Sequence, residues 1–302
     1  MGLEESAPPA FPSPAPPARR EVAQGPITEN INGLREGSTA GLGPRLGFDA
    51  AAAVCAGALV APIITVIDRG IIENASGRNG LMPSIRSSLK QLVLRPHTFM
   101  LSKPFRLIFL VYTSTYLTAN TIDTITSLRK GTRPTTVTAG PAKFIATSSV
   151  NASLSIYKDS RLARLFGPIN AVPRPVPPAS YALFAARDAL TIFASFNLPP
   201  ILAQRLPEGM GVGTWEWDRL SIAQFVAPAA IQVFSTPLHL LGLDLYNRPK
   251  GSEVEWRGRM EKVWRDWGRS CVARVGRIVP AFGVGGVVNM RARRALMERL
   301  EG

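Results

Sequence analysis

The chain has 302 residues, a formal net charge of +14 and hydrophobic residues at 46% of its positions. A charge this positive calls for an anionic partner, which could be nucleic acid, an anionic lipid surface or an anionic solute. The two cysteines, Cys55 and Cys271, both have apolar neighbours, which excludes the disulfide framework of a small secreted protein.

The first 45 residues differ in composition from the rest of the chain. They contain the proline-rich stretches 7–10 and 12–17 and few large apolar residues. Such a segment cannot bury enough surface to offset its chain entropy. It also lacks the apolar core of a secretory signal. We therefore predict a disordered tail over residues 1–45, followed by one membrane domain over residues 46–300.

Six apolar segments follow the tail, alternating between segments without a leading charge and segments that begin at an arginine. In chain order they are 50–67, 106–122, 135–157 (interrupted by Lys143), 187–204 (starting at Arg187 or slightly earlier), 220–243 and 277–290. Asp49 and Asp68 bracket the first one, and its 18 uncharged residues are close to the lower limit for a helix that crosses a bilayer. Basic polar stretches connect the two members of each pair, which suits contact with a membrane surface.

The segments form three similar pairs. The arginines that open the second members, Arg106, Arg187 and Arg277, lie 81 and 90 residues apart. A repeat of this size indicates three copies of one structural unit. We predict an all-α membrane protein with six transmembrane helices in three tandem two-helix repeats, at about residues 46–130, 131–207 and 215–300. The alternative is a soluble helical bundle, because buried core helices are also apolar all round.

Prolines occupy matching places in this repeat. Pro62 and Pro237 lie late in the first and third segments that lack a leading arginine, and Ser153 takes the equivalent place in the second. A proline inside a helix removes one backbone hydrogen bond and kinks the helix. We predict structural kinks at Pro62 and Pro237, the alternative being that each proline marks a helix end.

Other function classes receive little support. No basic stripe interleaved with aromatic residues appears, so nucleic acid is not an expected partner. His97 and His239 have no cysteine or carboxylate at metal-ligand spacing. No nucleophile triad or pair of carboxylates stands out in a polar setting. We expect no enzyme activity, no metal and no cofactor.

From residue 46 to residue 300 the chain resembles the mitochondrial carriers, a family built from three tandem repeats. The resemblance is carried by the spacing of the segments and by residues 268–280, which look like the entry to a carrier's sixth helix. The first, third and fifth helices of the family end in Pro-x-Asp/Glu-x-x-Lys/Arg, whose charges form a closing ring of ion pairs. Of that motif this sequence keeps two prolines and one lysine, namely Pro62, Pro237 and Lys158.

The resemblance also implies a substrate site on the second, fourth and sixth helices. It places Arg106 at the first contact, the pair Arg187-Asp188 at the second and Arg277 at the third. In the family, an arginine followed by an acidic residue goes with amino-acid-type substrates: the guanidinium pairs with the carboxylate, and Asp188 takes the ammonium group. The alternative is that Arg187 and Asp188 neutralise each other, while Arg106 and Arg277 extend to the membrane surface.

The resemblance thus implies transport of a small anionic or zwitterionic, carboxylate-bearing solute of amino-acid type. The implied location is the mitochondrial inner membrane, with the outer membrane as the alternative, and anionic lipids such as cardiolipin are the implied lipid partners. The alternative function is that of a carrier-fold protein that no longer transports and acts as a membrane adaptor or assembly factor. The loss of most residues of the Pro-x-Asp/Glu-x-x-Lys/Arg motif favours this alternative. The three arginines at corresponding positions favour transport.

Overall fold

The computed structural model describes residues 41–137, 140–168, 175–196, 198–206, 211–212, 215–216, 219–248 and 255–300. Residues 1–40 of the predicted tail lie outside the described residues. Helix α2 begins at Leu42, a few residues before the predicted start of the membrane domain.

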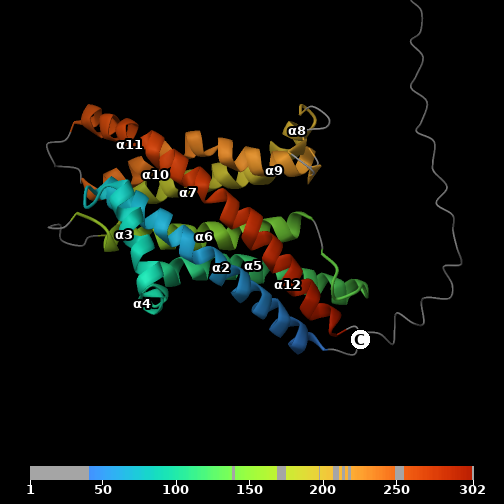
Figure 1. The fold of residues 1–302 in the computed structure, drawn as a ribbon. Coiled ribbons are helices and arrows are strands. Elements are labelled where there is room, and N and C mark those ends of the chain that lie inside the picture. The colour runs from blue at the N-terminus through green and yellow to red at the C-terminus, as the bar shows by residue number, and fades with distance from the viewer. Residues whose placement is uncertain are drawn as a thin grey trace, which may run out of the picture. The chain divides into compact units, whose positions relative to one another are not determined.

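The described residues are almost entirely helical (Figure 1). In chain order the helices are α2 (Leu42–Ser76), α3 (Leu81–Leu94), α4 (Pro96–Met100), α5 (Lys103–Lys130), α6 (Pro141–Leu165), α7 (Pro178–Phe196), α8 (Leu198–Ala203), α9 (Arg219–Ala230), α10 (Gln232–Asn247), α11 (Trp256–Gly276), the π-helix η1 (Val279–Gly285) and α12 (Gly286–Glu298). The strands β1 (Gly211–Val212) and β2 (Trp215–Glu216) form one short antiparallel pair.

All six predicted apolar segments fall largely within these helices, but the fourth begins earlier than its arginine indicated. Helix α7 starts at Pro178, so Arg187 lies in the middle of the helix and not at its entry. The reason is local: residues 179–186 are uncharged and mostly apolar, and proline is well suited to the first turn of a helix.

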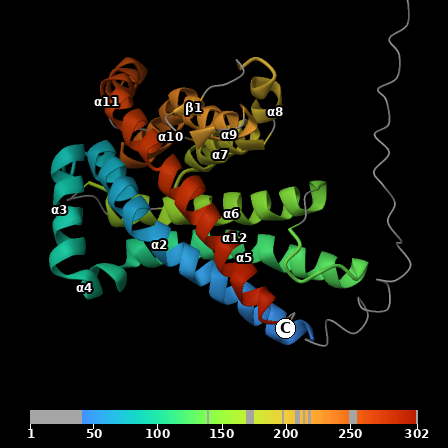
Figure 2. The ribbon, with the colours of Figure 1, turned by 45° about the vertical axis from the view of Figure 1, so that its right-hand side comes forward.

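The helices pack as a closed ring. Helix α2 packs against α5, α5 against α6, α6 against α7, and α7 against α9 and α10. Helix α10 packs against α11, and the segments that follow, η1 and α12, return to α2. Figure 2 shows this closure, with the blue α2 and the red α12 side by side.

Buried polar pairs hold the closure between α2, α5 and α12. Arg293 Nε donates to Asp49 Oδ1 at 2.7 Å, and Thr124 Oγ1 donates to Asp49 Oδ2 at 2.6 Å. The amides of Asn120 and Asn289 donate to each other's oxygens, at 2.9 Å in both directions. Because buried polar groups are costly without partners, these contacts fix the register of the first helix against the last.

The contact between α2 and α5 requires a residue without a side chain. A Cβ atom at Gly57 would overlap the hydroxyl of Thr113 on α5. Gly47 lies on the same helix, is exposed, and has nothing within 4 Å of the position that its Cβ would take. Substituting the two glycines in turn therefore separates the free-energy cost of a clash between α2 and α5 from the cost of replacing a glycine within the helix.

We expect Gly57→Val to lower the free energy of unfolding by about 1–3 kcal/mol, because overpacking forces neighbouring helices apart. Gly47→Val, the matched control, should change it by less than about 0.5 kcal/mol. Thermal unfolding of the purified proteins in detergent measures both. Equal midpoints for the two variants would show that α2 and α5 do not pack as closely as described.

Pro62 and Pro237 lie inside helices, α2 and α10 respectively, and do not mark helix ends. Pro237 leaves the carbonyl of Val233 without its usual helical donor. That carbonyl accepts a hydrogen bond from the indole Nε1 of Trp267 on α11, at 2.9 Å. A neighbouring helix thus satisfies the freed group, and the kinks themselves stay a prediction.

Among the described residues, two helical stretches are long and apolar enough to cross a membrane, Leu42–Ser76 and Phe225–Asn247. Core helices of soluble proteins can meet the same criterion, so two such stretches alone decide little. The all-helical structure agrees with a membrane protein, whereas the predicted six spans in three repeats are not confirmed.

Candidate functional site

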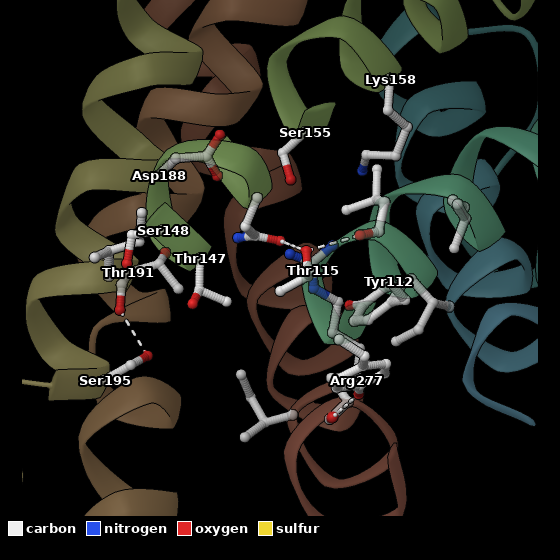
Figure 3. Close-up of a pocket in the computed structure, with 18 of the residues that line it drawn as sticks. Tyr112, Thr115, Thr147, Ser148, Ser155, Lys158, Asp188, Thr191, Ser195 and Arg277 are labelled. Carbon is white, nitrogen blue, oxygen red and sulfur yellow. Dashed lines mark hydrogen bonds between the residues drawn. The ribbon is translucent and has the colours of Figure 1, made fainter. Parts of the chain in front are cut away.

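A cavity of about 200 Å³ lies inside the ring of helices (Figure 3). Helices α2, α5, α6, α7 and α10 line it, together with the segment from Arg277 to Gly286. A water molecule takes up about 30 Å³ of the liquid, and pockets for drug-sized ligands start at about 300 Å³. The cavity therefore has room for a small solute only.

The lining contains charged, neutral polar and apolar side chains. Its charged residues are Asp68, Lys158, Asp188 and Arg277. Figure 3 shows Lys158, Tyr112 and Arg277 on one side of the cavity, and Asp188, Ser148, Thr191 and Ser195 on the other.

Asp68 on α2 joins two cations from distant parts of the chain. Its Oδ1 accepts from Arg277 Nη1 at 2.6 Å, and its Oδ2 accepts from Lys158 Nζ at 2.6 Å. Lys158 also contacts Asp159 Oδ1 at 2.8 Å. Helices α2 and α6 and the end of α11 are thereby connected by charge at one side of the cavity.

Arg187 on α7 continues this network away from the cavity. Its Nη2 lies 2.7 Å from Asp159 Oδ2 and 2.7 Å from Asp188 Oδ1. Its Nη1 lies 3.4 Å from His239 Nδ1, and the residue is 1% exposed. The network contains as many arginines and lysines as aspartates, which lowers the cost of burying its charges.

One carboxylate oxygen in the network has no partner. Asp188 Oδ2 is buried and makes no hydrogen bond among the described residues, although Asp188 lines the cavity. The residue is only 8% exposed. A buried carboxylate oxygen without a donor is unfavourable. The arrangement therefore favours a solute that brings a hydrogen-bond donor or a positive charge to this atom.

Arg274 on α11 adds a buried positive charge next to the cavity. The residue is 1% exposed, and its Nε donates to Oε1 of Gln232, a cavity residue, at 3.0 Å. Its Nη2 has no hydrogen-bond partner, and in the part of the chain that the structure describes no carboxylate pairs with it. This excess of positive charge favours a carboxylate on the solute.

The structure brings three of the four predicted site residues together. Asp188 and Arg277 line the cavity, and Arg187 lies behind Asp188. Arg106 lies elsewhere, exposed in the first turn of α5. The cavity begins further along α5, at Ile108 and its neighbours. The placement of Arg106 at a substrate contact came from the resemblance to the carriers.

Arg106 lines a separate groove of about 450 Å³ between α5 and α6. The groove has four exposed cations and no acidic residue in its lining, and leucine side chains form much of the remainder: Lys103, Arg106, Leu107, Leu110, Tyr157, Arg161, Arg164 and Leu165.

The sequence interpretation did not assign four other residues near the cavity, namely Asp68, Asp159, Gln232 and Arg274. Asp68 and Lys158-Asp159 directly follow apolar segments, and charges at such ends were the available signal. Gln232 and Arg274 gave no such signal, because their roles depend on contact between α10 and α11.

A family model described as probable citrulline exporter matches residues 52–297. No curated protein matches the chain. The matching family is not that of the mitochondrial carriers, and no match to the carriers was found, so the predicted membership of that family is wrong. The carrier motif had charges where this chain has Ile64, Ile67, His239 and Gly242. What remained was the spacing of apolar segments, which is not specific to one membrane family.

Proposed function

Because the chain belongs to the family of probable citrulline exporters, we propose that it carries citrulline or a similar zwitterionic amino acid across a membrane. The family is one of transporters, so the chain is not an enzyme.

The observation that carries this proposal is the unpartnered oxygen of Asp188 in a cavity that also holds Arg277. An α-amino acid carries an ammonium group and a carboxylate on one carbon atom. The ammonium group pairs with Asp188 Oδ2, and the carboxylate lies toward Arg277 and the excess charge of Arg274. The protein then provides each charged group of the solute with a partner in place of the water that the group loses on entering the cavity.

Arg187 has a positioning role in this proposal. It is buried behind Asp188 and holds Asp188 Oδ1 at 2.7 Å, which leaves Oδ2 for the solute. Asp159 and His239 hold Arg187 in turn. Of the four residues predicted from the sequence, we keep Asp188 and Arg277 as direct contacts of the solute.

We also propose that the six predicted apolar segments span the membrane in three pairs. They lie in α2, α5, α6, α7 with α8, α9 with α10, and η1 with α12. The outward face of α2 supports this, since Leu59 is 54% exposed and Val54 and Ile63 are each 46% exposed. Apolar side chains are exposed on several other helices of the ring as well: Leu110, Ile145, Phe193, Val226 and Phe234. Such a surface suits lipid better than water. The mitochondrial location rested on the overturned resemblance and stays a prediction.

Anionic lipids remain proposed partners, and the groove around Arg106 supports this. Its four cations suit a phosphate headgroup, and its leucines suit an acyl chain. Arg106 and Arg161 approach the same groove from α5 and α6, so removing both charges tests the whole groove.

We expect cardiolipin to raise the thermal unfolding midpoint of the detergent-solubilised protein and to lose most of this effect in Arg106→Ala/Arg161→Ala. Each Lys or Arg near an anionic surface contributes about 1 kcal/mol. Arg129→Ala, which removes an exposed cation at the far end of α5, should keep the full shift. The groove is no lipid site if the double variant responds to cardiolipin as the unaltered protein does.

Uptake of labelled citrulline into proteoliposomes tests the transport proposal. Vesicles with the full chain should accumulate label faster than protein-free vesicles, and unlabelled citrulline should suppress the difference. Uptake no faster than in protein-free vesicles, for correctly folded protein, would contradict transport and favour the adaptor alternative.

A further inference from the structure

Hydroxyl groups from three helices form part of the neutral cavity wall, beside apolar side chains such as Ile108, Val111 and Ile192. Thr115 on α5, Thr147 and Ser148 on α6, and Thr191 and Ser195 on α7 all line the cavity. Figure 3 shows Thr147, Ser148, Thr191 and Ser195 gathered where α6 faces α7. We call these five residues the hydroxyl wall. It contains no charge.

Four of these hydroxyls have already used their hydrogen. Thr115, Thr191 and Ser195 donate to the carbonyl four residues earlier on their own helices, at 2.7, 3.0 and 2.8 Å. Thr147 donates in the same way to the carbonyl of Lys143. A hydroxyl has one hydrogen and two lone pairs. These four groups therefore present only acceptor oxygens to a solute.

Ser148 differs from the other four. Its Oγ is buried and has no hydrogen-bond partner in the described part of the chain. Its hydrogen is available, so it is the hydroxyl of the wall that can donate to a solute. The wall thus combines several acceptors with one donor.

We propose that the hydroxyl wall binds an uncharged terminal group with several N–H donors and one carbonyl acceptor, which is a ureido or carboxamide group. Its N–H groups donate to Thr147, Thr191 and their neighbours, and its carbonyl accepts from Ser148. This inference rests on the proposed transport of a zwitterionic amino acid, and it assigns the residues that select the side chain.

The charges of the cavity explain why a neutral side chain is preferred. Asp68 already accepts from two cations, so Asp188 Oδ2 is the carboxylate oxygen left over in the described lining. It neutralises one ammonium group, and the second cation of a diamino acid has no counter-charge. An acidic side chain has only hydrogen-bond acceptors, and four of the five hydroxyls in the wall can also only accept, so the two would not pair. Unpaired buried polar groups cause strong discrimination in binding sites.

Competition against labelled citrulline uptake tests the selectivity, with the full chain in proteoliposomes. We expect glutamine, which carries a carboxamide, to compete within about tenfold of citrulline, because it keeps the donors and the acceptor. Ornithine and glutamate should compete at least about tenfold more weakly than glutamine. Ornithine that competes as well as citrulline overturns the proposal.

Ser148→Ala should raise the half-saturation concentration of citrulline about fivefold, the value of one neutral hydrogen bond, with the maximum rate unchanged. It removes no hydrogen bond of the described structure, so folding should be unaffected. The matched control is Ser88→Ala, because the Oγ of Ser88 on α3 is likewise buried without a hydrogen-bond partner in the described part of the chain but does not line the cavity. Equal half-saturation for the unaltered protein and Ser148→Ala contradicts the role of Ser148.

A binding measurement keeps the inference separate from transport. In detergent, citrulline should raise the thermal unfolding midpoint and ornithine should not, whether or not vesicles show uptake. Absent uptake together with this selective shift would reject the proposed transport and support the selective wall. Equal shifts for the two amino acids, or none for either, reject the wall.

Discussion

Asp188→Asn is expected to lower the uptake of a zwitterionic amino acid at least about thirtyfold while the helical fold is kept. Losing one partner of a buried charge pair costs about 2–5 kcal/mol, and an amide cannot neutralise the ammonium group of the solute. Arg187 keeps Asp159 as its second carboxylate partner, at 2.7 Å, which is why we expect the variant to fold. Initial uptake rates, at equal amounts of protein in the vesicles, measure the effect.

Two controls separate this role from a general effect of charge. Glu261→Gln removes an exposed carboxylate on α11 and should leave uptake unchanged. An analogue of the solute without its ammonium group should be affected much less by Asp188→Asn, because it does not need the negative partner. Unchanged uptake of the zwitterion by Asp188→Asn would exclude Asp188 from the binding site.

Asp68→Asn is expected to destabilise the protein by about 3–5 kcal/mol, since it leaves Arg277 without its carboxylate partner and Lys158 with Asp159 alone. Asp68 accepts from Lys158 and Arg277, each at 2.6 Å, and so links helices that are far apart in the sequence. An asparagine has almost the same shape, so the loss reports charge and not packing. The unfolding midpoint in detergent, with the concentration of protein held constant, is the measurement.

The comparison for Asp68 is an exposed ion pair. Glu298 pairs with Arg294 at 2.9 Å, and the two side chains are 52% and 73% exposed. Glu298→Gln should shift the free energy of unfolding by less than about 0.5 kcal/mol, because solvent screens such pairs. A midpoint for Asp68→Asn that equals that of Glu298→Gln would mean that the buried network does not hold the helices together.

The sequence predicted those helices whose apolar segments have clear boundaries. Helix α2 was found because Asp49 and Asp68 enclose an uncharged segment, although the helix extends beyond both of them, from Leu42 to Ser76. The start of α7 was placed at Arg187 or slightly earlier, since a charge looked like the entry to a segment, yet the apolar residues before it extend the helix back to Pro178. Local composition marks the interior of an element better than its ends.

The candidate site was predicted only in part, for a different reason. Arg187, Asp188 and Arg277 were singled out, and the structure brings them close to one cavity. Asp68 was not singled out as a site residue, because its partner Arg277 is 209 residues away in the chain and nothing in the local sequence indicates that the two pair. The hydroxyl wall was missed as well, since scattered serines and threonines become a surface only when three helices are packed together.

Closure of the ring through α2 and α12 sets an order for the synthesis of this protein. Asp49 and Arg293 are 244 residues apart, yet they are paired in the folded chain. At about 5–20 residues per second, the ribosome adds the second partner roughly 12–50 s after the first. During this interval the first helix carries a carboxylate whose cation has not yet been made. A nascent chain that stops before α12 never completes the pair, so the contact between the first and last helices can form only after almost all of the domain has been made.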